Sequence, residues 1–150
     1  MNKTIAVFIL VLSVLCISCN DKCVEDNQPL PASFFVEILD EASGENVFEN
    51  ETYVGTDITV TDVLDNAIEF NFIEGTNIIH LLPQTTIVAR NIEIKIKLNN
   101  LTTMDSDEVL IKYDVTSLQE ECYTSYSFAN ILFPNNTSEI DEKGIFKVKI

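Results

Sequence analysis

The 150-residue chain has no tryptophan, one histidine, four glycines and four prolines, and nine basic residues stand against 24 acidic ones. Its formal charge of −15 opposes phosphate backbones and anionic lipid surfaces, so nucleic acid is excluded as a partner. With so few glycines and prolines, turns must be made largely by Asn, Asp, Ser and Thr. Hydrophobic residues form 46% of the chain, which is ample for one packed core.

Motifs that mark common enzymes are also missing. The sequence has no G-x-S-x-G turn for a nucleophilic serine and no glycine-rich loop for phosphate. His80 is the single candidate for a general base or a zinc ligand, and it has neither a second histidine nor a plausible cysteine partner. We therefore interpret His80 as a structural residue on the less buried face of a strand, and we predict neither an enzyme nor a cofactor.

A long apolar run lies at the N-terminus. Residues 1–18 combine a basic start at Lys3, an uncharged run over 5–17 and a small residue, Ser18, which is the layout of a secretory signal. A helix that spans a bilayer needs about 20 apolar residues, and the polar stretch that begins at Asn20 ends this run too early. A buried core helix is the alternative, but the run has no amphipathic period.

The apolar run ends in a short cysteine-containing motif. Its residues Leu15, Ile17, Ser18 and Cys19 resemble the lipobox of bacterial lipoproteins, in which an aliphatic and a small residue precede an invariant cysteine. Cys16 departs from the pattern, because the family normally has leucine there. The resemblance implies cleavage before Cys19, diacylglycerol on its sulfur and an acyl group on its new amine. Two or more acyl chains hold a protein stably on a membrane without a spanning helix.

The resemblance and the polar, acidic composition of the residues that follow together indicate a chain in three parts and a place in the cell. Residues 1–18 form the signal peptide, residues 19–31 an acidic tether, and residues 32–150 the folded domain. The mature protein is then expected in the cell envelope, attached to the membrane through Cys19. Asn20 replaces the aspartate that marks retention in the inner membrane, which favours the outer membrane and leaves its periplasmic or surface face open.

Cleavage leaves two thiols in the mature protein. Cys16 leaves with the signal and Cys19 is alkylated, so Cys23 and Cys122 remain. In an oxidising compartment these two favour one disulfide, which closes a loop of about 100 residues. The alternative is two independent cysteines, with Cys122 in the core and Cys23 on the tether. A redox or zinc site at Cys16 and Cys19 lacks a second ligand pair.

Period-two alternation dominates the domain and predicts strands. It is clearest over residues 91–98, whose inward positions are Ile92, Ile94, Ile96 and Leu98. We expect further strands within residues 33–39, 57–61, 67–74, 78–83, 109–115, 123–133 and 145–150, and a connector over 134–144. The prediction is an all-β fold, an antiparallel β-sandwich of about seven or eight strands, whose pattern resembles immunoglobulin-like and prealbumin-like sandwiches.

Two segments of the predicted domain carry hypotheses about binding. Residues 99–108 are expected to form a loop in which Asp105, Asp107 and Glu108 offer oxygen ligands to calcium. The cluster lacks the order of an EF-hand loop, so plain solvated charges are the alternative. The last strand, residues 145–150, is a candidate sheet edge for strand addition, although its two lysines can protect such an edge.

Anchor, tether and an all-β scaffold without catalytic groups lead to one main hypothesis. We expect a lipid-anchored envelope protein whose non-enzymatic sandwich serves protein-protein interaction or scaffolding, through loops or an edge strand. The alternative is a ligand-binding module, for calcium or carbohydrate, of an envelope uptake system.

Overall fold

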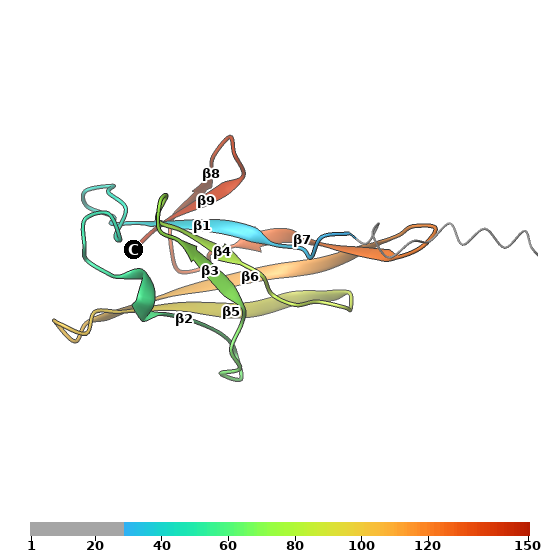
Figure 1. Ribbon diagram of the computed structural model, residues 1–150, viewed down its shortest axis with the longest axis horizontal. Helices are drawn as coiled ribbons and strands as arrows, with labels where there is room; N and C mark the ends of the chain where they lie inside the picture. The colour runs from blue at the N-terminus through green and yellow to red at the C-terminus, as the bar shows by residue number, and fades with distance from the viewer. Residues whose placement is uncertain (1–28) are drawn as a thin grey trace, which may run out of the picture.

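The computed structural model describes residues 29–150 and shows two β-sheets packed face to face (Figure 1). One sheet has five strands in the order β3-β4-β1-β9-β8, and the other has four in the order β2-β5-β6-β7. The elements are β1 (Phe34–Leu39), the 3-10 helix η2 (Gly55–Asp57), β2 (Ile58–Asp62), β3 (Phe70–Ile73), β4 (Ile78–Leu81), β5 (Ala89–Asn99), β6 (Ser106–Gln119), β7 (Thr124–Leu132), β8 (Ser138–Ile140) and β9 (Ile145–Lys149).

The core forms between the sheets from the alternating apolar positions. On β5 and β6, Ile94 lies opposite Ile111 and Ile96 opposite Val109, and all four side chains are fully buried. Residues that face each other across an antiparallel pair point to the same side of the sheet, so these positions form one continuous apolar face. Each fully buried aliphatic side chain contributes about 1.5–3 kcal/mol. The predicted all-β fold is confirmed.

The architecture differs from the prediction in strand number and direction. Residues 29–150 form nine strands instead of seven or eight, because β8 arises inside the segment expected as a connector. The first and last strands, β1 and β9, are parallel neighbours, with Val36 opposite Phe146. Parallel neighbours need a crossover, and here nearly the whole domain lies between them. The sandwich is therefore mostly, not wholly, antiparallel.

The strand expected at a sheet edge lies inside its sheet. β9 pairs with β1 on one side and with β8 on the other, so the prediction that residues 145–150 form an edge is wrong. Among the described strands, the edges are β3 and β8 in one sheet and β2 and β7 in the other. Alternation within one segment cannot reveal whether a strand lies at an edge, because its neighbours are set by the strand order of the whole sheet.

Two β-bulges in the four-stranded sheet meet at one carboxylate. Asn91 in β5 and Asn130 in β7 have positive φ angles of 53° and 52° and lie at the register shifts of their strands. Asp114 of the strand between them accepts hydrogen bonds from the Asn130 side chain at 2.7 Å and from the Asn91 backbone N–H at 2.9 Å. These bonds hold the pKa of Asp114 below its usual value, and they fix both bulges.

Candidate functional site

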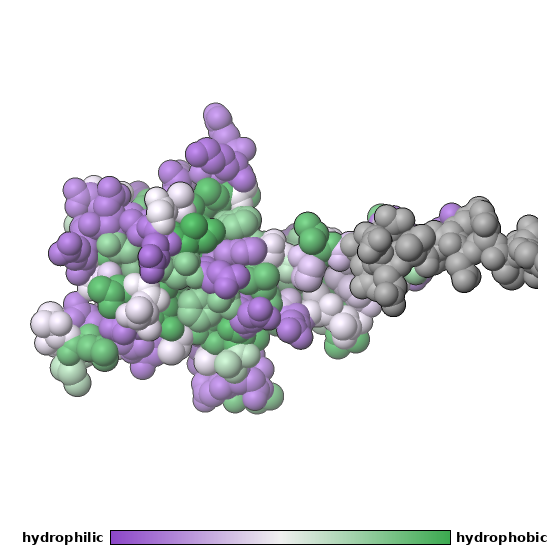
Figure 2. All heavy atoms as spheres, viewed as in Figure 1, coloured by the Kyte–Doolittle hydropathy of each residue, from purple (hydrophilic) through white to green (hydrophobic). Residues whose placement is uncertain are grey.

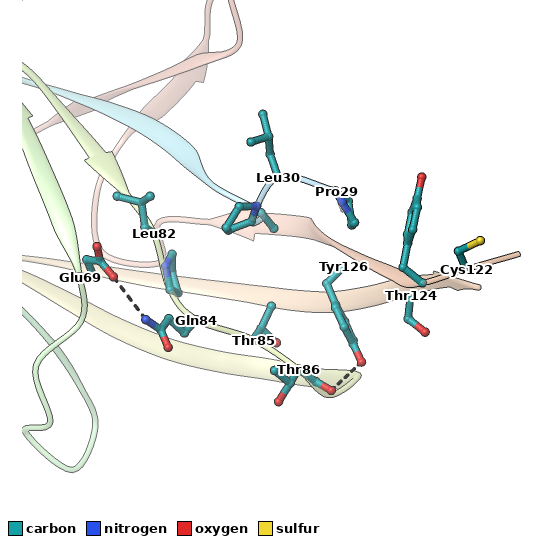
Figure 3. A pocket seen from close by; sticks show the side chains of 14 residues that line it. Pro29, Leu30, Glu69, Leu82, Gln84, Thr85, Thr86, Cys122, Thr124 and Tyr126 are labelled. Carbon is teal, nitrogen blue, oxygen red and sulfur yellow. Dashed lines mark hydrogen bonds between the residues drawn. The ribbon is translucent and has the colours of Figure 1, made fainter. Parts of the chain in front are cut away.

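An open groove of about 560 Å³ lies where the described chain begins (Figure 3). It is lined by residues 29–32, by the loop between β4 and β5 (82–86) and by residues 122–126 at the start of β7. Among the described residues that line it, Glu69 is the only charged one. The volume falls within the range of small-ligand pockets, about 300–1,000 Å³.

Two hydrogen bonds shape the groove (Figure 3). The Tyr126 hydroxyl of β7 donates to the Thr86 carbonyl at 2.6 Å, and the Gln84 side chain donates to the Glu69 carboxylate at 3.3 Å. Both join segments that are distant in sequence, so they tie the loop between β4 and β5 to its neighbours. The groove wall is thus held in place by the fold.

Apolar side chains remain exposed around this end of the domain. Leu30 is 91% exposed, Ile87 69% and Leu118 64%. Figure 2 shows the same character, since apolar and weakly polar residues predominate on the visible face of the arm that carries β6 and β7. Exposed apolar surface of this kind marks interaction sites.

β7 forms a long open edge of the four-stranded sheet. Its nine residues pair only with β6 among the described strands, and they include no charged residue and no proline. Edge strands are usually protected by lysine, proline, bulges or short length, and here only the bulge at Asn130 serves. The other edges offer less: β3 has four residues, β8 has three, and β2 is partly covered because the Ile68 N–H donates to the Val60 carbonyl.

Of the cysteines with a predicted role, only Cys122 lies within the described residues. Cys122 lies in the exposed turn between β6 and β7 and takes part in a disulfide bond. The alternative that placed Cys122 in the core is therefore wrong. Cys19, the predicted lipid attachment site, and Cys23, the predicted disulfide partner, lie outside the described residues, so both assignments stay predictions.

The three calcium candidates do not share a loop. Asp105 precedes β6, whereas Asp107 and Glu108 belong to that strand. Adjacent strand residues point to opposite faces, so their carboxylates diverge. Asp107 accepts a 2.5 Å hydrogen bond from the Tyr53 hydroxyl. Within residues 29–150, no group of three potential metal-ligating side chains forms.

Tyr53 and His80 show how polar atoms are accommodated near the core. Burial and the bond to Asp107 raise the pKa of Tyr53 above its ordinary value. His80 lies on the outer, less buried face of β4, as predicted, and its ring stacks on Phe35 of β1 with 4.4 Å between centroids. Its Nε2 is buried and has no hydrogen-bond partner in the described part of the chain. The arrangement fits a packing role.

The groove and the β7 edge are the evidence on function, because comparisons with known proteins add none. A scan against protein-family models, a search of curated proteins and a search of solved structures each found no match to this chain. Among residues 29–150, no helix has the length and apolar character needed to cross a membrane. Reasoning from sequence missed both sites, although the absence of charge from residues 124–132 was a readable signal for the edge.

Proposed function

We propose that this is a lipid-anchored protein of the cell envelope whose non-enzymatic sandwich binds another envelope protein by strand addition at β7. The observation that carries the proposal is the open, uncharged, nine-residue edge. An extended segment that pairs with such an edge gains main-chain hydrogen bonds, and its alternate side chains give specificity. Attachment through Cys19, placement in the outer membrane and an immunoglobulin-like or prealbumin-like form of the sandwich belong to the same proposal.

The groove supports this proposal by its position. Thr124 and Tyr126, at the start of β7, line the groove as well as the edge. A segment that pairs with the start of β7 therefore ends next to residues of the groove, whose lining also includes Tyr123 and Pro83. The edge strand and the groove thus share residues at the start of β7.

In-cell crosslinking from the edge tests the proposal. A photo-reactive amino acid at Ser127, which is exposed on β7, is expected to give a discrete crosslinked adduct with another envelope protein. Thr59 is the matched control, because it is exposed on β2, the opposite edge of the same sheet. Charged substitutions Ser125→Lys and Ser127→Lys should abolish partner capture from a neighbouring β7 position, since lysine blocks strand pairing. Equal yields from Ser127 and Thr59 contradict the proposal.

A small-ligand module is the second candidate, and the groove volume favours it. Tyrosine rings and threonine hydroxyls in the lining suit a sugar, whose faces stack on aromatic rings. Thermal melts over a glycan panel test this, because a ligand that binds only the folded state must raise the unfolding midpoint. Melts with calcium and with chelator test the calcium version in the same way. An unchanged midpoint throughout rejects this candidate.

A further inference from the structure

The two sheets have unequal numbers of strands, and the mismatch lies beside β7. Phe34 of β1 packs on Tyr113 of β6 and on Phe128 of β7, with ring centroids 6.0 and 5.5 Å apart. Phe146 of β9 packs on Phe133, just beyond the end of β7, at 5.5 Å. β1 thus lies over β7 and β9 over the residue just beyond its end, and β8, the next strand of the five-stranded sheet, is exposed at all three residues.

Burial along β8 and β9 shows the same mismatch. Ile140 of β8 lies opposite Phe146 and so points to the core side of the sheet. Val148 of β9, on that same side, is 0% exposed, whereas Ile140 is 60% exposed. The difference arises because β7 ends the sheet below. We call the open edge of β7 together with the core side of β8 the β7–β8 step.

We propose that the β7–β8 step takes a single extended segment of a partner protein, with apolar side chains at every second position. This inference rests on the proposed function and names the partner's chemistry. The segment pairs with β7 through its backbone, and its inward side chains cover Ile140 and the partly buried Phe128, Ile131 and Phe146. Its outward side chains face water and are polar.

The overhang of β8 excludes a second copy of this chain. If two copies paired through β7, β8 of each would lie opposite β7 of the other. That position is already filled, because β1 and β9 of the other copy pack on β7 and on the residue just beyond its end. Only one strand, without a sheet stacked on it, fits the step. The chain carries a formal net charge of −15, which disfavours acidic partners, so basic residues are expected at the ends of the segment.

Peptide binding to the mature protein tests the inference. The probe is a fluorescent peptide of alternating valine and threonine with lysine at both ends, and its control is an isomer with the valines in one block. Ile140→Lys removes the apolar contact on β8, and Leu101→Lys is its matched control because Leu101 is 69% exposed in a distant turn. We expect Ile140→Lys and the block isomer each to weaken binding at least about fivefold, and Leu101→Lys to leave it unchanged.

The outcomes separate this inference from the proposed function. Equal affinity for the two peptides, or no effect of Ile140→Lys, overturns the inference, while a crosslink from Ser127 keeps strand addition. A dimer joined through β7 in sedimentation experiments also overturns it. So does slow hydrogen exchange along all of β7 without peptide, since the chain's own tether then fills the step. Absence of any crosslink from Ser127 removes the proposed function as well.

Discussion

Single residues in this sandwich are constrained mostly by close packing, and Gly55 is the clearest case. A Cβ atom at this position would lie 2.2 Å from Cδ1 of Phe72, and the Cγ of that ring is only 2.8 Å away. The whole ring must therefore move to admit a methyl group. Phe72 in turn packs on Phe48, with 4.8 Å between centroids, so its movement disturbs the core.

Gly55→Ala should lower the free energy of unfolding by about 1–3 kcal/mol, the usual cost of overpacking. Gly75→Ala is the control, because nothing lies within 4 Å of a Cβ there. We expect the control to change stability by no more than about 0.5–1 kcal/mol. Urea unfolding of both variants measures the difference, and equal stability for the two would show that the Phe72 ring yields freely.

Tyr113 links burial to alkaline stability. Burial raises the pKa of Tyr113 to about 12 from an unfolded value of about 10. The contribution to stability is therefore complete below about pH 10 and is lost as the pH rises toward 12. Tyr113→Phe has no ionisable group at this position, so we expect a smaller loss between about pH 8 and 11. Urea unfolding at both pH values checks this, and an identical loss in both proteins contradicts it.

Residue patterns predicted the core better than they predicted the sites. Ile94, Ile96 and Leu98 are fully buried as their alternation indicated, because a period of two leaves little choice of face. The acidic candidates failed as a cluster because Asp107 and Glu108 extend β6 beyond its apolar part. Polar strand ends look like loops in a sequence, and only pairing with β5 makes them strands.

The short strand β8 and the position of β7 in its sheet are features of this fold that the local sequence does not reveal. β8 was missed because its three residues are all exposed and carry no burial pattern. The edge position of β7 was missed because it depends on sheet order, which follows from contacts between distant strands. The hairpin of β3 and β4 was predictable, because a short turn that contains Gly75 separates an alternating run from a mainly apolar one.

Asp114 offers a test of how the bulges are held. Asp114→Ala removes the acceptor for both Asn91 and Asn130, so we expect a lower unfolding midpoint and faster hydrogen exchange at the Asn91 amide. Because the folded pKa of Asp114 is lowered, this stabilisation is present above about pH 4 and fades as the pH falls below it. Asp105→Ala, in the turn before β6, is the control. Equal exchange at Asn91 in both variants argues against the bridge.

At the scale of the whole molecule, a disulfide between Cys23 and Cys122 would join the tether to the turn at the start of β7. Mass spectrometry of the non-reduced mature protein should find no free thiol. Cys122→Ser should lower the free energy of unfolding by about 2–5 kcal/mol, since the loop closed is long. Two free thiols in the wild-type protein would remove the pairing.

The lipid anchor gives the second whole-molecule prediction. Cys19→Ala removes the sulfur that carries diacylglycerol, so the protein should leave the membrane fraction or accumulate unprocessed. Fractionation followed by immunoblotting checks this, with Cys16→Ala as the matched control within the signal. Unchanged membrane attachment of the Cys19 variant contradicts the assignment.

Hydrogen exchange along β7 tests the function most directly. Deuterium uptake of residues 124–132 is compared between the protein in isolated envelopes and the same protein after purification in detergent. If a partner strand pairs with the edge, uptake in the envelopes should be slower, and the lysine substitutions at Ser125 and Ser127 should remove the difference. Equal uptake in the two preparations would contradict strand addition at β7.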